Sequence, residues 1–92
     1  MNFNNVTLEK NPNAKISYKD GITSSQMTEI INLDASNKNI SSSKGVEQLT
    51  NLESLDLSNN NLEYIDLTLN EKLTNINLSN NNFTKNVILY ND

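Results

Sequence analysis

Hydrophobic residues recur at a fixed interval through the second half of the chain. Residues 52–83 read LESLDLSNNNLEYIDLTLNEKLTNINLSNNNF. The apolar residues return 21 positions later, and the matched pairs are Leu52 with Leu73, Leu55 with Ile76, and Leu57 with Leu78. A repeat of this length is typical of stacked units, because one unit cannot bury its apolar side alone. The sequence therefore predicts successive units that shield each other's leucines.

Each unit contains a short alternating segment. In SLDLS, at residues 54–58, alternation sends Leu55 and Leu57 inward and the other three side chains outward. Stacked units would pair these segments as a parallel sheet with strands about 4.8 Å apart. The same pattern recurs at half length within residues 62–72. We therefore expect a second short strand on the return side of this unit.

The chain before the second unit divides into two parts. Residues 30–51 form a first unit, in which Gly45 is expected to precede a helical turn at residues 46–49. Residues 1–29 do not follow the repeat. Within them, Asn-Pro-Asn at residues 11–13 predicts the turn of a β-hairpin, and hydroxyl residues before Met27 predict a short helix over about residues 24–29. We expect residues 1–29 to cap the stack and residues 30–92 to form the repeats.

The motif L-x-x-L-x-L-x-x-N-x-L occurs at residues 52–62 and again, ending in Phe83, at residues 73–83. It resembles leucine-rich repeats. The first unit resembles the opening repeat of bacterial internalin-like proteins, and LEYIDLTLN resembles the bacterial 21-residue subclass. The resemblance covers about residues 30–91. It implies an α/β fold that is mostly β, a short solenoid of parallel strands with an N-terminal cap of hairpin and short helix.

The asparagine of the motif has a physical role that does not depend on the resemblance. Its amide offers donors and an acceptor, which can bond main-chain groups of neighbouring turns. We expect such a ladder at Asn60, Asn70, Asn81 and Asn91. Lys38 occupies this place in the first unit. Water, or Asn37 and Asn39, is expected to satisfy the turn there.

Two surfaces are candidate binding sites. On the outer face of the sheet, Asp34 and Asp56 should be neighbours, and like charges directly opposite are unfavourable. A partner's arginine or lysine would explain this column, and a solvated face is the alternative. On the return side, Tyr64, Asp66 and Leu69 should be exposed and form an anchor patch. Scattered surface apolar residues are the alternative there.

The end of the sequence is a third candidate surface. Four consecutive apolar residues, Val87, Ile88, Leu89 and Tyr90, follow the last motif. An unpaired strand there would favour pairing with another chain. We expect either a homodimer interface, a partner strand or a tail that folds back as its own cap.

The amino-acid composition excludes several kinds of catalytic and metal-binding chemistry. The 92 residues are 35% hydrophobic and include no cysteine and no histidine, so disulfides, thiolate chemistry and the commonest general base are excluded. Only two glycines are present, too few for a glycine-aspartate calcium repeat. We expect no catalytic residues, no metal and no cofactor.

The net charge of −4 limits the classes of binding partner that fit this chain. It argues against a nucleic-acid binder and fits docking on a basic protein surface. The N-terminus has no positive start followed by an apolar run. We therefore expect no signal peptide, no membrane span and a cytoplasmic location, in a bacterial cell or an infected host.

These observations lead to two functional hypotheses. In the first, the chain is a small free-standing bacterial or phage protein that acts as an inhibitor or adaptor by occupying the surface of another protein. An anti-CRISPR-like inhibitor is one example of this class. The start at Met1 favours this hypothesis. In the second, it is a fragment of a larger bacterial surface or adhesion protein, located at the cell surface. The internalin-like opening repeat favours the second.

Overall fold

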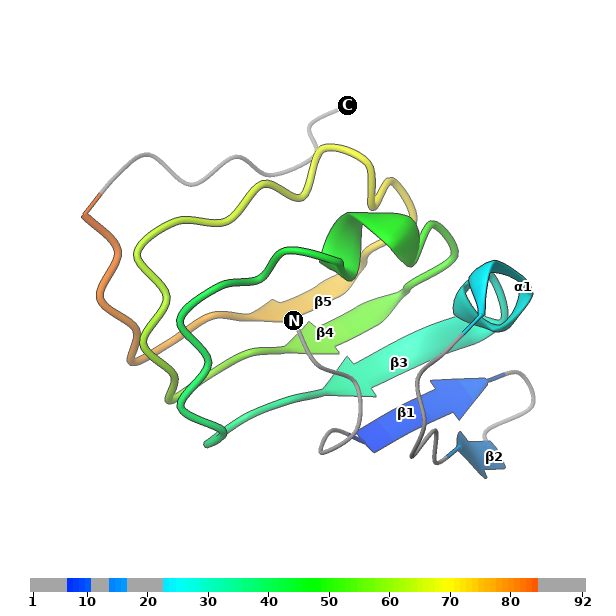
Figure 1. Cartoon of the computed structure of the whole chain (residues 1–92), viewed down its shortest axis with the longest axis horizontal. Helices are drawn as coiled ribbons and strands as arrows, with labels where there is room; N and C mark the ends of the chain where they lie inside the picture. Colours follow the sequence, from blue (N-terminus) through cyan, green and yellow to red (C-terminus); the bar gives the residue numbers. More distant parts are fainter. Residues whose placement is uncertain (1–6, 11–13, 17–22, 85–92) are drawn as a thin grey trace.

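One open sheet of five strands organises the chain. The computed structural model describes residues 7–10, 14–16 and 23–84. The sheet order is β2-β1-β3-β4-β5. Figure 1 shows β3, β4 and β5 running side by side in one direction. The chain that leads from β3 to β4, and from β4 to β5, runs back on the opposite side, and we call these two stretches the return segments. In chain order the elements are β1 (Thr7–Lys10), β2 (Ala14–Ile16), α1 (Ser24–Met27), β3 (Ile30–Asp34), the 3₁₀ helix η2 (Val46–Gln48), β4 (Ser54–Asp56) and β5 (Asn75–Asn77). The fold is thus mostly β, with three parallel strands.

The hairpin expected near the N-terminus is present in the described residues. β1 pairs antiparallel with β2, from Leu8 with Ile16 to Lys10 with Ala14. Its other side pairs antiparallel with β3. The hairpin therefore extends the sheet on the side of β3 that faces away from β4.

The predicted short helix α1 is also present, and it is one turn long. Thr23 Oγ1 accepts a hydrogen bond from Gln26 N–H at 3.2 Å, and Gln26 Oε1 accepts one from Thr23 N–H at 2.8 Å. This reciprocal capping box satisfies two main-chain donors that the helix itself leaves unpaired. Asn51 Nδ2 then donates to Thr28 O at 2.7 Å, which ties the end of α1 to the turn between the first two units.

The repeat period sets the register of the parallel strands. Leu33 pairs with Leu55, and Leu55 pairs with Ile76, so residues 22 and 21 positions apart are neighbours in the sheet. Hydrogen bonds extend this pairing past the strand ends, with Ala35 N–H donating to Asp56 O at 2.8 Å and Leu57 N–H to Asn77 O at 2.9 Å. Each unit is therefore bonded to the next along the strand and the turn that follows it.

The core lies between the strands and the return segments. Among the residues whose burial is described (23–84), eleven hydrophobic side chains are buried, at Ile30, Leu33, Ala35, Val46, Leu49, Leu52, Leu55, Leu57, Leu62, Ile65 and Leu67. Burying a side chain of this size contributes about 1.5–3 kcal/mol. The first two units supply all of these residues, so the core is concentrated there.

The return sides of the two units differ. The first contains η2, which begins after Gly45 at φ 113°, close to the expected helical turn. The second has no helix at residues 63–67 and alternates as expected, with Ile65 and Leu67 buried. The expected second strand was wrong in one respect: of residues 62–72, only Asp66 forms a β-bridge, and that bridge is isolated. The segment around Asp66 lies beside η2 of the preceding unit. A 3₁₀ helix does not offer the regular ladder of main-chain donors and acceptors that a strand needs as its neighbour.

Asparagine amides join the units, as the motif predicts. Asn60 Nδ2 donates to Ala35 O and Leu57 O, both at 2.9 Å. Its Oδ1 accepts from the N–H groups of Lys38 and Ile40, at 3.0 Å each. The expectation that water, or Asn37 and Asn39, would satisfy the first turn was therefore wrong, because the next unit's asparagine does so.

The other predicted ladder positions differ among themselves. Asn81 Oδ1 accepts from Leu62 N–H at 2.9 Å, and its Nδ2 donates to Leu57 O at 2.9 Å. Asn70 is fully buried and donates to Val46 O at 2.8 Å, but its Oδ1 has no hydrogen-bond partner among the described residues. Asn91 lies outside the described residues.

The last described unit is the most exposed. Ile76 was expected to be shielded, yet 41% of its surface is accessible, and Leu73, Leu78 and Phe83 are only partly buried. Ile76 lies on β5, an edge strand, and within the described residues no unit follows to cover it. Among the described residues no helix has the length and apolar character that crossing a membrane would require.

Candidate functional site

A hollowed surface lies on the side of the molecule opposite the strands. A cleft of about 450 Å³ is lined by residues 41–44 and by Glu47 of the first unit, and by Glu63, Tyr64 and Asp66 of the second. A smaller hollow of about 250 Å³ lies against Glu47, Asp66, Thr68 and Leu69. Glu47 and Asp66 border both hollows. We call the surface formed by these residues the return cleft.

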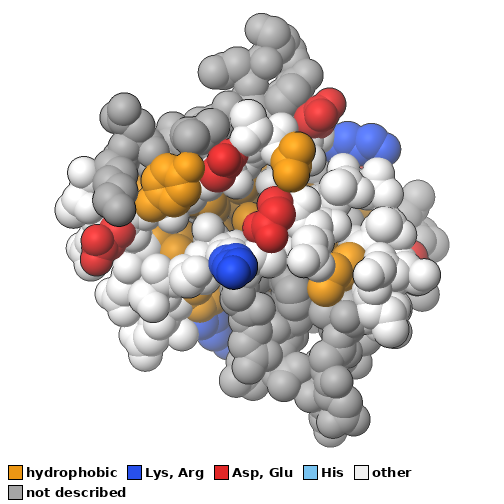
Figure 2. Space-filling model, turned by 45° about the horizontal axis from the view of Figure 1, so that its top comes forward, with side chains coloured by type: hydrophobic (Ala, Val, Ile, Leu, Met, Phe, Trp, Pro, Cys, Tyr) orange, Lys and Arg blue, Asp and Glu red, His pale blue; other side chains and the backbone are white. Residues whose placement is uncertain are grey.

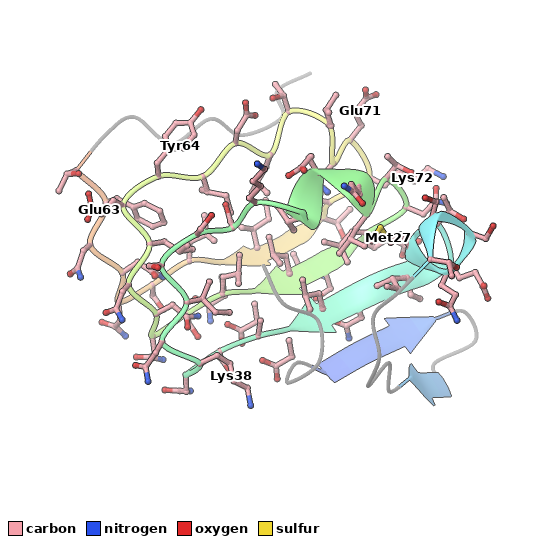
Figure 3. All side chains as sticks on the ribbon, viewed as in Figure 1. Met27, Lys38, Glu63, Tyr64, Glu71 and Lys72 are labelled. Atoms are coloured by element: carbon pink, nitrogen blue, oxygen red, sulfur yellow. The ribbon has the colours of Figure 1, made fainter. Side chains whose placement is uncertain are left out.

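Two apolar side chains of the return cleft are exposed, as the alternation predicts. Tyr64 is 41% accessible and Leu69 is 59% accessible. Figure 3 shows Tyr64 and Glu63 together near one end of the return segment and Glu71 and Lys72 near the other end. Figure 2 shows separate hydrophobic side chains on this face, with acidic and basic side chains between them. The apolar area is therefore divided by charges.

Asp66 is held in one orientation by the turn that follows it. Its Oδ1 accepts from Thr68 N–H at 2.9 Å and from the Thr68 hydroxyl. The bond from the hydroxyl, with the bond from the N–H, lowers the pKa of the Asp66 carboxyl below its ordinary value. Asp66 is therefore ionised at neutral pH and oriented between the two hollows.

The charge of the return cleft is negative. Glu47, Glu63 and Asp66 contribute three carboxylates, against the single ammonium of Lys44. Glu47 Oε1 accepts from Gly45 N–H at 2.9 Å, so η2 and the residue before it fix the position of this side chain. The arrangement suits a partner's cation that stacks on an aromatic ring beside carboxylates.

The outer face of the sheet contains the other predicted pair. Asp34 and Asp56 are neighbours in register, as expected. Alternation alone offers no stability reason for this pair of carboxylates, but the structure supplies one. Asp34 Oδ1 accepts from Ser36 N–H at 3.1 Å and Oγ at 2.8 Å, and Asp56 Oδ1 accepts from Ser58 N–H at 2.9 Å and Oγ at 2.6 Å. Both carboxylates stabilise the turns after their strands, so a partner's cation is not needed to explain them.

The position of Ser58 differs from the one predicted for this face of the sheet. The alternation places it outward, but it is buried, with 5% of its surface accessible. The strand β4 ends at Asp56, and the chain then turns, with the main chain of Asn59 at φ 57°. The turn directs the Ser58 hydroxyl back to Asp56, where it is covered.

The third predicted surface is not tested. Val87, Ile88, Leu89 and Tyr90 lie outside the described residues. The expectation of a homodimer or partner strand at these residues therefore stays a prediction.

Sequence reasoning identified only Tyr64, Asp66 and Leu69 of the return cleft. It missed Glu47, Glu63 and residues 41–44, although they complete the hollow around Tyr64. The available signal was the repeat offset, since Lys44 and Glu47 precede Asp66 and Leu69 by 22 positions. Residues at this offset are neighbours in a stack, and the same reasoning would have joined the two halves.

Among the described residues, no group of three or more acidic side chains is placed to hold a metal ion. Comparisons with models of protein families, with curated proteins and with solved structures give no match to this chain.

Proposed function

We propose that this chain is a short leucine-rich-repeat solenoid, of the bacterial internalin-like and 21-residue kind, that acts by binding another protein. Parallel strands spaced by 22 and 21 residues and asparagine bonds between units support the solenoid. A solenoid presents extended surfaces for partners. Surface occupancy, as in a small acidic inhibitor or adaptor, is the mode of action that fits a net charge of −4.

The return cleft is the proposed binding surface, and one observation carries this choice. The exposed ring of Tyr64 borders a hollow that also contains three carboxylates, from Glu47, Glu63 and Asp66. Tyrosine anchors are enriched at interface centres, and cations are attracted to both the ring face and the carboxylates. We therefore propose a partner with a basic surface, whose arginine or lysine enters this cleft. The outer sheet face is the weaker candidate, because Asp34 and Asp56 already have structural roles.

The first experiment measures binding of an arginine-containing peptide by NMR titration of the labelled protein. Glu63→Gln and Glu71→Gln each remove one exposed carboxylate and leave the same net charge. Only Glu63 lines the cleft, and Glu71 lies near the opposite end of the return segment (Figure 3). We expect E63Q to weaken binding several-fold more than E71Q. Equal losses would show that the peptide responds only to net charge, and would contradict the cleft.

The second experiment concerns the apolar anchors. We expect Tyr64→Ser with Leu69→Ser to abolish capture of a basic partner from bacterial lysate, while the fold remains intact by circular dichroism. The affinity of an identified partner is then measured by calorimetry with both proteins. An affinity that the double substitution leaves unchanged would exclude this surface.

A further inference from the structure

Within the described residues, the outer edge of β5 has no neighbouring strand. Asn75 N–H donates to Glu53 O at 3.1 Å, and Asn77 O accepts from Leu57 N–H at 2.9 Å, so both residues direct their main chain toward β4. Successive residues of a strand direct these groups to opposite sides. The N–H and C=O of Ile76 therefore point away from β4, to the edge where the described sheet ends.

This edge is also unusually neutral. Residues 73–84 contain no charged residue, although the whole chain has a net charge of −4. Asp34 and Asp56 are in register, but the next position in the column is Asn77. Edge strands are commonly protected from pairing by charged side chains. β5 lacks that protection, so no charged side chain of the strand itself would oppose the approach of a second acidic copy.

The same edge is self-complementary. An antiparallel pair of identical strands has a two-fold axis, and a residue on this axis exchanges both of its main-chain hydrogen bonds with its own copy. Ile76 has the required direction of N–H and C=O, and its side chain is 41% exposed beside partly buried Leu78. With Ile76 on the axis, Asn75 lies opposite Asn77 of the partner subunit, and no like charges meet.

We propose that β5 pairs antiparallel with the β5 strand of a second copy, with Ile76 on the two-fold axis. The pairing is closed, because it uses the same edge of both copies and yields a dimer rather than a fibre. It is independent of the return cleft. Short strands bury little area, so we expect a weak dimer that forms on concentration and is strengthened by salt, which screens the acidic charge.

Sedimentation equilibrium of the full chain from about 10 µM to about 1 mM tests the pairing. We expect the average mass to rise from 10.3 kDa toward twice that value. Ile76→Pro removes the edge N–H without removing a bond to β4, and Ile76→Ala keeps the N–H but loses the same side chain. I76A should still dimerise, and I76P should remain monomeric. A wild-type chain that stays monomeric, or an I76P variant that dimerises equally, would overturn the proposal.

A second test places opposite charges on the two copies and identifies the register of the β5–β5 pairing. It does not require that β5 accept a proline. Asn75→Lys with Asn77→Lys places like charges opposite each other in the proposed dimer, and so does Asn75→Glu with Asn77→Glu. Each double variant alone should be monomeric, while an equal mixture should form a heterodimer in native mass spectrometry. Circular dichroism checks that both fold. Failure of two folded variants to associate, when the wild type dimerises, would place the interface elsewhere and contradict the inference.

Discussion

At the scale of single residues, asparagine has two different structural roles. The side chains of Asn60 and Asn81 bond main-chain groups of the preceding unit. Asn37, Asn39, Asn59 and Asn80 instead adopt positive φ between 56° and 58°, a region that asparagine tolerates better than most residues. Two local requirements of the turns therefore account for these six asparagines.

The two buried asparagines should respond differently to the same substitution. Asn60→Leu leaves the N–H groups of Lys38 and Ile40 without their acceptor, which costs about 1–3 kcal/mol for each group. Asn70→Leu removes an acceptor that already lacks a partner, and the carbonyls of Val46 and Leu49, to which Asn70 Nδ2 donates, keep main-chain N–H donors. We therefore expect a cost within about 1 kcal/mol. Urea denaturation of both variants measures the difference. Equal losses of stability would contradict the role assigned to Asn60.

The Asp66 carboxyl provides a pH-dependent test. Its lowered pKa means that the folded state favours the ionised form, so the stabilising bonds are present above the unfolded pKa, about 3.9, and are lost as the pH falls through the folded pKa. We expect Thr68→Val to raise the pKa of Asp66 toward its ordinary value, as measured by carboxyl NMR titration. The stability difference between wild type and T68V should narrow at low pH. A pKa that T68V leaves unchanged would exclude the hydroxyl as the cause.

At the scale of elements, turns determine where strands end. Asn59 and Leu69 occupy equivalent places in the two halves of one unit, but only Asn59 has positive φ. Position 69 therefore does not require a residue that tolerates the left-handed region of φ and ψ. The two halves share an apolar pattern and differ in their turns.

This difference gives a matched pair of substitutions. Asn59→Val should cost about 1–2 kcal/mol, because a β-branched residue is disfavoured at φ 57°. Leu69→Val, at an exposed site without positive φ, should stay within about 0.5 kcal/mol. Thermal unfolding compares them. A destabilising L69V beside a neutral N59V would reverse the assignment of the turns.

At the scale of the whole molecule, stability is unevenly distributed. Leu55 and Ile76 occupy the same motif position, yet Leu55 is 1% exposed and Ile76 is 41% exposed. Leu55→Ala should cost about 2–5 kcal/mol and Ile76→Ala less than about 1.5 kcal/mol. Denaturation at low micromolar concentration, where the proposed dimer is dissociated, measures both. Similar costs would show that β5 is as firmly packed as β4.

The sequence predicted those features that depend on periodicity. The inward positions of Leu55 and Leu57, the pairing of Asp34 with Asp56 and the exposure of Tyr64 and Leu69 follow from alternation and offset. It did not predict the burial of Ser58, which depends on a turn after the strand. Nor did it predict the shape of the return cleft, because this arises where η2 and an extended segment of different geometry lie together.

The bonds from Asn60 back to residues 38–40 have a consequence for synthesis on the ribosome. Translation delivers the first turn about twenty residues before the side chain that completes it. A nascent chain ending at residue 59 therefore has a turn whose donors still bond water, and each unit is finished only when its successor emerges. We therefore expect the turns of the first and second units to be completed only after the unit that follows each of them has been translated.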